Sequence, residues 1–456
     1  MSHFKLKALM KRLAYIFPFL LLLTSCEKFL EVDPQLQVDE SKAITNASSA
    51  TTALNGLYNR LGTNDYYGSN FPALSYLSGG DVQWSGSQSA PQEVVLHRLT
   101  ADNGYVGSAW AAIYKTILSA NYIIQAVPQV VDPLFTETQR NEVLGQAYFI
   151  RSLAYFDLVR GWGGVPIILT PTREASENAN VARSTVAETY AQVLKDLELA
   201  ETLLPETTNR HKATRKTVWA LRARYHLYRS EWEQAESYAT KVINDSGNYS
   251  LLKPYAAFFA SNAVGTAESV LELSYTISSV NNHSNWWLPP ALGGRREWSP
   301  APQLVTLLTS AETGGGRKEL LGQTAAPGNL WYGKLYYRSP TGTDPAYIIR
   351  TAELYLIRAE ARAQQNNLGA ALNDLHAVRD RAGLAALITT DKTDLLNAIS
   401  EERRLEFAFE ADRWFDLVRT GKAGEVLGIT NPNKYLFPIP TAEIVANAAI
   451  VQNTDY

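Results

Sequence analysis

Cysteine is almost missing from this chain. Its 456 residues include one cysteine, Cys26, so no disulfide bond can form within the chain. No CxxC pair and no EF-hand spacing occurs, and the six histidines are scattered without the spacing of metal ligands. We therefore expect no cofactor and identify no metal ligands, while a Ca²⁺ site formed by irregular loops stays open.

A surplus of basic residues is missing too. The chain has 42 Lys and Arg residues against 45 Asp and Glu residues, which gives a net charge of −3. Nucleic-acid-binding proteins usually concentrate positive charge in a patch or stripe. The composition therefore gives no support to nucleic-acid binding.

Signatures of catalysis are lacking as well. No HExxH, GxSxG or GxxxxGK[ST] motif occurs, and GWGGVP (residues 161–166) has Pro166 where the dinucleotide fingerprint needs its last glycine. We expect the protein not to be an enzyme, because no motif supports chemistry. Glycosidase carboxylates have no fixed sequence spacing, so a surface enzyme acting on polysaccharide stays an alternative.

No apolar run reaches the roughly 20 residues that span a bilayer. The run AYIFPFLLLL covers only residues 14–23 and follows several basic residues with no acid, which is typical of a secretory signal peptide. The LTSC that ends at Cys26 resembles the bacterial lipobox, whose cysteine is lipidated after cleavage. We predict a lipoprotein signal peptide over residues 1–25, lipidation at Cys26 and a tether over residues 26–45. A plain signal peptide with an incidental thiol is the alternative, and either Met1 or Met10 starts a complete signal.

The roughly 430 residues that follow exceed what one compact core usually holds, so the chain has several domains or stacks repeats. Apolar residues at helical spacing predict a hairpin of two helices joined by a short break near Ser230. In this hairpin the apolar positions are Val218, Leu221, Tyr225 and Tyr228, then Trp232, Ala235, Ala239 and Val242. The same pattern returns at Leu354, Ile357, Leu368, Ala371, Leu375 and Val378. Both copies resemble the tetratricopeptide pattern without most of its glycines.

Other helices are predicted at about residues 106–127, 137–160, 184–204 and 394–419. Two intervals, residues 62–104 and 247–349, lack helical periodicity and are rich in turn-forming residues. A structureless loop of that length is implausible in a compact protein, so we expect short helices, strands and ordered loops there. The second interval separates the two hairpins and is predicted to be an insertion presented by a helical scaffold.

Several sequence blocks resemble the SusD/RagB family of outer-membrane lipoproteins. The blocks are LTSCEKFLEVDPQ, WAAIYKTILSANYII, RSLAYFDLVRGWGGVPI, RTAELYLIRAEARAQQNNLGAALNDLHAVRDRAGL, ERRLEFAFEADRWFDLVRTGKA and the C-terminal KYLFPIPTAEIVANAAIVQNTDY. They appear in the family order between Cys26 and Tyr456. The last block departs from the family where Ala448 and Thr454 replace the usual prolines.

The resemblance implies a mainly α fold, with a tetratricopeptide-like helical-repeat scaffold and an irregular, loop-rich inserted region that carries the ligand site. Residues 46–456 would form a single unit, with the scaffold at about 46–61, 105–246 and 350–456 and the loop-rich ligand region at about 62–104 and 247–349. The implied protein is lipid-anchored through Cys26 on the outer membrane at the cell surface. It would bind oligosaccharide and deliver it to a SusC-type TonB-dependent transporter. Capture of peptides is the alternative within the family, and a structural adaptor without a ligand is another.

Aromatic side chains in the loop-rich intervals are the candidate ligand contacts. An indole or phenol ring can cover the apolar face of a sugar ring, while amides and charged groups meet its hydroxyls. We predict that two loops face one another and bind the ligand through Tyr66, Tyr67, Asp81, Trp84, Asn285, Trp286, Trp287, Arg295, Arg296 and Trp298. The alternative is that each indole anchors its loop in the core. We expect Trp286→Ala and Trp287→Ala to weaken ligand binding without lowering the melting temperature.

The charges of residues 402–416 alternate in sign within a predicted helix. At this spacing they are expected to pair across helical turns, and each pair would contribute about 0.2–0.5 kcal/mol. We interpret this segment as structural.

Overall fold

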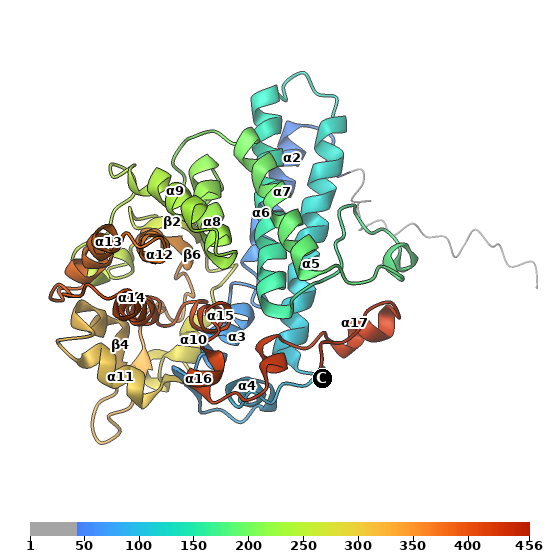
Figure 1. Cartoon of the computed structure of the whole chain (residues 1–456). Coiled ribbons are helices and arrows are strands. Elements are labelled where there is room, and N and C mark those ends of the chain that lie inside the picture. Colours follow the sequence, from blue (N-terminus) through green and yellow to red (C-terminus); the bar gives the residue numbers. More distant parts are fainter. Residues whose placement is uncertain (1–42) are drawn as a thin grey trace, which may run out of the picture. The chain divides into compact units, whose positions relative to one another are not determined.

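The computed structural model describes residues 43–456. The predicted signal peptide, the lipidation site Cys26 and residues 27–42 of the predicted tether lie outside the described residues. Residues Ile44–Tyr456 form one compact unit, and this unit is mainly helical (Figure 1). No helix within residues 43–456 is both long enough and apolar enough to cross a bilayer.

Four helices of the first half of the chain lie side by side (Figure 1). They are α2 (Ala47–Leu61), α5 (Gly104–Ala126), α6 (Glu137–Trp162) and α7 (Val186–Leu203). Three of them, α2, α6 and α7, begin with a capping box, in which the N-cap residue and the third helical residue pair with each other's backbone N–H groups. These local signals place the helix starts close to the predicted positions.

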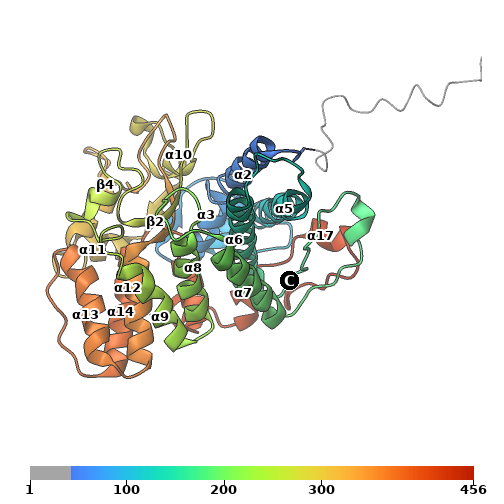
Figure 2. The same cartoon turned by 90° about the horizontal axis from the view of Figure 1, so that it is seen from above.

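Both predicted helical hairpins are present. The first consists of α8 (Arg215–Tyr228) and α9 (Trp232–Ile243), and the second of α12 (Thr351–Gln364) and α13 (Leu368–Arg381). Ser230 and Asn366 have positive φ angles of 55° and 63° and form the tight turns. The helix α9 packs against α12, and Figure 2 shows one row of helices from α13 through α12, α9 and α8 to α7. This stacking confirms the predicted tetratricopeptide-like scaffold.

The prediction of a single helix over residues 394–419 is wrong. The structure has α14 (Lys392–Glu406) and α15 (Arg413–Arg419), separated by a break in which Phe409 has a φ of 72°. A bulky residue rarely adopts this left-handed backbone. The Phe409 ring packs against Trp287 with 4.6 Å between the ring centroids. This packing partner lies far away in the sequence, so helical periodicity alone did not reveal the break.

The prediction that the charges of residues 402–416 pair across the turns of one helix is also wrong. Glu406 is completely buried and accepts hydrogen bonds from arginines of other elements. One of these, Arg350, is 1% exposed and lies 2.8 Å from Glu406 and 2.7 Å from Glu268. We define the buried charge cluster as Arg317, Arg350, Arg381, Glu268, Glu402, Glu406 and Glu410.

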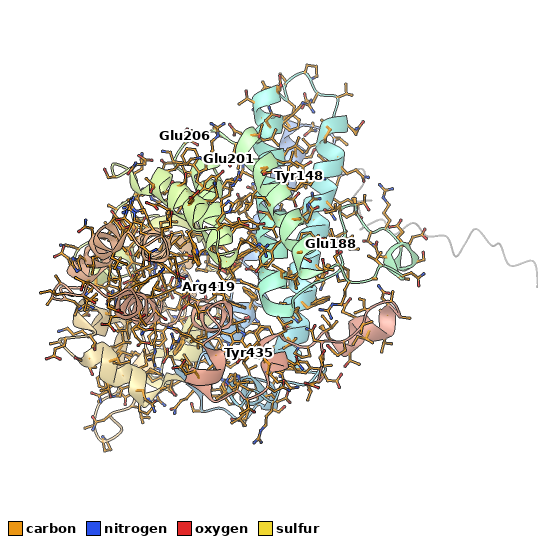
Figure 3. The ribbon with its side chains drawn as sticks, viewed as in Figure 1. Tyr148, Glu188, Glu201, Glu206, Arg419 and Tyr435 are labelled. Atoms are coloured by element: carbon orange, nitrogen blue, oxygen red, sulfur yellow. The ribbon has the colours of Figure 1, made fainter. Side chains whose placement is uncertain are left out.

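Figure 3 shows the contrast between interior and exterior charges on the scaffold. The side chain of Arg419 lies in the interior, where Nη2 is 2.7 Å from Glu360. Glu188 and Glu206 lie on the outside of the helices and are exposed. Exposed pairs typically contribute 0–1 kcal/mol, whereas breaking a buried pair costs several kcal/mol. The interior charges are therefore the ones that matter for stability.

We predict that the buried charge cluster makes stability fall as the pH rises toward 7. Burial raises the pKa of Glu410 to about 7, although Arg350 acts to lower it. The folded chain therefore holds a proton that the unfolded chain has released between about pH 4.5 and pH 7, so stability decreases across this window. In Glu410→Gln this decrease should shrink by about 1–3 kcal/mol. Urea unfolding at pH 5, 6, 7 and 8 measures the slope.

Some pH dependence should remain in Glu410→Gln, because burial also raises the pKa of Asp344, to about 6. The comparison therefore rests on the difference in slope between the two proteins and not on their absolute stability. An unchanged slope in the variant would show that Glu410 stays ionised in the folded chain.

The loop-rich intervals contain short elements, as predicted. The first interval holds α3 (Asn70–Ser78), β1 (Val82–Trp84) and α4 (Ser89–Val95). The second holds β2 (Ser269–Leu273), α10 (His283–Trp287), β3 (Trp298–Pro300), α11 (Pro302–Thr309), β4 (Leu321–Gln323), β5 (Trp331–Gly333) and β6 (Ala346–Arg350). The C-terminal part adds α16 (Ala423–Leu427) and α17 (Thr441–Ala446). Short 3-10 helices are η4 (Val127–Gln129), η5 (Ala175–Asn178), η6 (Tyr255–Phe258), η7 (Pro290–Leu292), η8 (Gly315–Leu320) and η9 (Pro432–Tyr435).

Three two-stranded antiparallel sheets organise these segments, namely β1–β3, β2–β6 and β4–β5. The β2–β6 pair joins the beginning and the end of the long insertion, because Leu273 lies opposite Ala346. The chain then enters α12 directly from β6. The insertion therefore leaves and re-enters the scaffold at one place.

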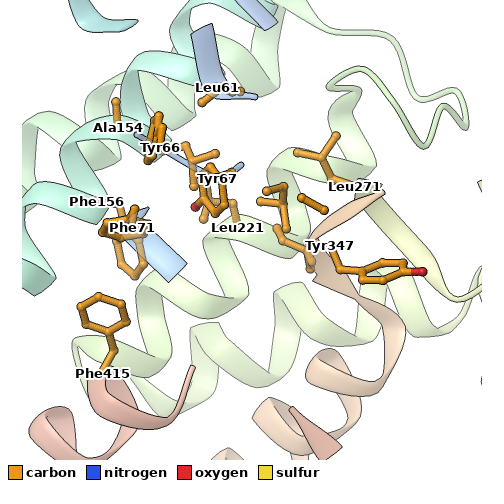
Figure 4. Close-up of a cluster of buried hydrophobic side chains, with 14 of the residues drawn as sticks. Leu61, Tyr66, Tyr67, Phe71, Ala154, Phe156, Leu221, Leu271, Tyr347 and Phe415 are labelled. Carbon is orange, nitrogen blue, oxygen red and sulfur yellow. The ribbon is translucent and has the colours of Figure 1, made fainter. Parts of the chain in front are cut away.

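One apolar core connects the scaffold to the loop-rich region (Figure 4). Phe71 of α3 stacks on Phe415 of α15 with 5.6 Å between the ring centroids. Phe156 of α6, Leu221 of α8 and Tyr347 of β6 belong to the same cluster. Burial of aromatic side chains contributes strongly to such a core because each removes a large area from water. The loop-rich region is thus held rigidly on the helices.

Candidate ligand-binding surface

The two loops with candidate ligand contacts meet in a two-stranded sheet. β1 pairs with β3 in antiparallel register, and Trp84 lies opposite Trp298. The Ser85 hydroxyl donates a hydrogen bond of 2.8 Å to the carbonyl of Arg296, which extends the contact beyond the strands. The predicted juxtaposition of these loops is therefore present in the structure.

Four indoles gather at this sheet, but they differ in exposure. Trp84, Trp287 and Trp298 are 8%, 1% and 0% exposed, whereas Trp286 is only partly buried. Trp286 stacks on Trp298 with 5.4 Å between ring centroids and an interplanar angle of 28°. Trp84 lies 6.2 Å from Trp286 in a tilted arrangement. Trp286 is therefore the indole with surface available to a ligand, and the other three form its support.

Arg295 lies on the ring of Trp286. Its guanidinium carbon is 4.9 Å from the ring centroid, which is within the range of a cation–π contact. The same guanidinium donates from Nε to the Glu297 carboxylate at 2.9 Å. The neighbouring Arg296 instead donates from Nε to the carbonyl of Trp331 at 2.8 Å. The two predicted arginines thus point to different partners.

Several buried polar atoms around Trp286 have no hydrogen-bond partner in the structure. They include the Nε1 atoms of all four indoles and Oε2 of Glu297, and the Tyr105 hydroxyl is unpaired as well. Burial, together with the negative charge of Glu297, raises the pKa of Tyr105 to about 12, so its hydroxyl keeps its proton at neutral pH. Unpaired buried polar groups are costly and are often completed by a ligand or by water. This surface can therefore offer donors and acceptors to a hydroxylated molecule.

Tyr66 and Tyr67 do not lie at this surface. They are 0% and 3% exposed, and both hydroxyls donate to the Asp157 carboxylate of α6, at 2.6 and 2.8 Å. Figure 4 shows them inside the core, close to Phe71. Nothing in the sequence near Tyr66 and Tyr67 indicates Asp157 as their partner. These two tyrosines have no free surface for a ligand.

Asp81 and Asn285 have other partners. The Asp81 carboxylate is buried and accepts a hydrogen bond of 2.9 Å from Arg404, while Arg413 lies 3.7 Å away. Asn285 is partly buried, and its main-chain carbonyl accepts a hydrogen bond of 2.7 Å from the backbone N–H of Arg295. Asp81 therefore ties β1 to the C-terminal helices, and Asn285 holds the turn that carries Arg295.

Sequence reasoning missed two residues of this surface. Glu297 lies within GGRREWSP, between Arg296 and Trp298, and its charge opposite Arg295 could have been noticed there. Tyr105 begins α5 on the scaffold and carries no local signal. The influence of the Glu297 charge on its pKa depends on how the loops fold back onto that helix.

A roomier hollow lies elsewhere in the unit. A pocket of about 380 Å³ is bordered by α5, residues 166–181 and α17, with Trp110, Tyr114, Ile168, Ala446 and Ile450 among its walls. Most of these groups are apolar, and the amide of Asn447 is already bonded to the carbonyls of Asn178 and Val181. Its wall also contains one unpaired donor, the indole Nε1 of Trp110, and the polar side chains of Lys115, Thr172 and Glu443. No cluster of three or more possible metal ligands occurs within residues 43–456.

Comparison with known families gives two matches. A SusD-like family model, described as starch-binding and associating with the outer membrane, matches residues 28–227. A second model, that of the SusD family, matches residues 332–432. Among curated relatives, the SusD-like protein P38 of Formosa agariphila is 27% identical, over 95% of this chain and 96% of the relative. The SusD-like protein P2 of the same organism is 28% identical, over 97% of this chain and 99% of the relative.

Solved structures share the fold. A SusD superfamily protein from Bacteroides vulgatus has a TM-score of 0.82 at 20% identity, over 90% of this chain and 99% of the other. A protein described as a laminarin-binding SusD-like protein has a TM-score of 0.79 at 25% identity, over 91% of this chain and 100% of the other. The two family models, the full-length relatives and the shared fold agree with one another. The chain therefore belongs to the SusD/RagB family.

Proposed function

We propose that the protein binds an oligosaccharide at the surface around Trp286. The observation that carries this proposal is a partly exposed indole, stacked on a buried one and surrounded by unpaired donors and acceptors. An aromatic plane bordered by hydrogen-bonding groups suits a sugar ring, which has apolar faces and hydroxyls at its edge. The resemblance to a laminarin-binding protein supports the same ligand class.

We further propose that the protein is a cell-surface lipoprotein, anchored in the outer membrane through Cys26. It would pass its ligand to a SusC-type TonB-dependent transporter for nutrient uptake. The signal-like N-terminus and the family description as associating with the outer membrane support this role. A binding protein of this kind needs no catalytic groups, so no product should form from a bound glycan.

Calorimetry tests the ligand class. The form from Glu27 onward retains the described core, which lies within Ile44–Tyr456. We would titrate it with laminarihexaose, maltohexaose, a hexameric uronate and a hexapeptide, and analyse each mixture for cleavage products. Saturable binding of a glycan supports the proposal. Binding of the peptide alone would instead support peptide capture, product formation would support an enzyme, and binding of none of the four would contradict the proposal.

A further inference from the structure

Arg295 and the protein core both cover the ring of Trp286. One face of this indole stacks on Trp298, which is fully buried. The guanidinium of Arg295 also lies over this ring, 4.9 Å from its centroid. A sugar ring that stacks on Trp286 needs this position for itself. In the structure as it stands, Arg295 covers the proposed stacking face.

The contacts that hold Arg295 in place are weak enough to be exchanged. The Arg295 side chain is 47% exposed, whereas that of its carboxylate partner Glu297, two residues further along the chain, is 15% exposed. A cation–π contact at an exposed site is worth about 0.5–1 kcal/mol, and a ligand hydroxyl bound to Glu297 would compensate for the lost ion pair. The backbone of the turn is fixed instead by the hydrogen bond from the Arg295 N–H to the Asn285 carbonyl. The guanidinium can therefore leave while the turn keeps its shape.

Departure of the guanidinium would uncover acceptors as well as the ring. Glu297 would lose its charge partner, and its Oε2 atom is already without a hydrogen bond. The Tyr105 hydroxyl is also unpaired, and the charge of Glu297 raises its pKa while that of Arg295 lowers it. A carboxylate can accept two hydrogen bonds from neighbouring hydroxyls of one sugar, whereas it repels a ligand carboxylate or sulfate.

We propose that Arg295 is a displaceable cover of Trp286, and that the uncovered site takes a neutral sugar ring, read at its edge by Glu297 and Tyr105. This inference rests on the proposed function and gives it a substrate class. Glu297 and Tyr105 determine specificity by direct contact, and Arg295 lowers affinity by competing for the ring.

Arg295→Met tests the cover, because methionine keeps an apolar chain and removes the charge. The affinity for laminarihexaose should rise about three- to tenfold. Arg98→Met is the matched control, since Arg98 is exposed and has no ion pair within residues 43–456. Its affinity should equal that of the unmodified chain. A loss of affinity in Arg295→Met would overturn the proposal, because Arg295 would then be a ligand contact.

Tyr105→Phe tests whether the Tyr105 hydroxyl forms a hydrogen bond with a hydroxyl of the sugar. The hydroxyl has no protein partner, so its removal should leave the melting temperature unchanged or slightly higher. Affinity for laminarihexaose should fall about three- to tenfold, since one hydrogen bond is lost. Unchanged affinity would remove Tyr105 from the site. Tighter binding of the hexameric uronate than of laminarihexaose by the unmodified chain would exclude a neutral ligand.

A measurement without any glycan separates the cover from the proposed function. Acrylamide quenches exposed indoles, and the signal of Trp286 is the difference between a protein and its Trp286→Phe counterpart. Quenching of Trp286 should be at least twofold stronger in the Arg295→Met background. Stronger quenching with no binding of any glycan would support the hypothesis that Arg295 covers Trp286 and would contradict the proposal that the protein binds an oligosaccharide. Equal quenching in both backgrounds would show that Arg295 does not cover Trp286, whatever the ligand is.

Discussion

Replacing Arg350 by methionine is expected to lower the free energy of unfolding by about 3–5 kcal/mol. Arg350 is 1% exposed and contacts three carboxylates, those of Glu268, Glu406 and Glu410, at 2.6–2.8 Å. Burial alone would raise the pKa of Glu406, yet the surrounding arginines lower it to about 2. The substitution would leave these carboxylates in the interior with too few positive partners. Urea unfolding of the form from Glu27 onward, followed by circular dichroism, measures the loss.

Lys253→Met is the matched control for this prediction. Lys253 pairs with Asp380 on the surface, where the two side chains are 58% and 74% exposed. Such a pair contributes about 0–1 kcal/mol, so the control should unfold almost like the unmodified chain. Equal stability of both variants would mean that the buried charge cluster rearranges or admits water when Arg350 is removed.

Trp286→Ala and Trp287→Ala should differ sharply, contrary to the expectation drawn from the sequence that they would behave alike. Trp287 is 1% exposed and packs against Phe409 and Trp298. Its truncation leaves a cavity and should cost about 3–5 kcal/mol of stability. Trp286 is partly exposed, so its truncation should change stability much less.

The effect on binding should follow the opposite order. Loss of an aromatic anchor at the centre of a binding surface costs about 2 kcal/mol, which is about a 30-fold loss of affinity. Trp286→Ala should therefore lose most of its affinity for laminarihexaose while it stays folded. Calorimetry and thermal unfolding on the same samples measure both quantities. Normal binding by a folded Trp286→Ala protein would move the ligand site away from this surface.

The scaffold could be predicted because its signals are local. A capping box at Thr136 starts α6, and apolar spacing around Val218 and Leu221 defines the first hairpin. Periodicity failed at residues 407–412, where packing of Phe409 against Trp287 interrupts a helix that the local sequence favours. Non-local contacts of this kind leave no trace in the spacing of neighbouring residues.

The candidate site could be predicted only in part, for the same reason. Aromatic loops at Trp84 and Trp286 were identified by composition, and their juxtaposition is present in the structure. Exposure could not be read from composition, because it depends on partners such as Asp157, which holds Tyr66 in the core. Tyr105 was missed because the sequence does not distinguish a tyrosine in the first turn of a helix from an ordinary core residue.

The pairing of β2 with β6 has a consequence for how such proteins can diversify. Since Leu273 and Ala346 are opposite one another, residues 274–345 begin and end at neighbouring points of the fold. Arg350 and Glu268 fasten this attachment at its base. An exchange of residues 274–345 between relatives would change the aromatic surface, but the incoming segment would have to supply a partner for Glu402 and Glu406 in place of Arg317 and a packing partner for Phe409 in place of Trp287.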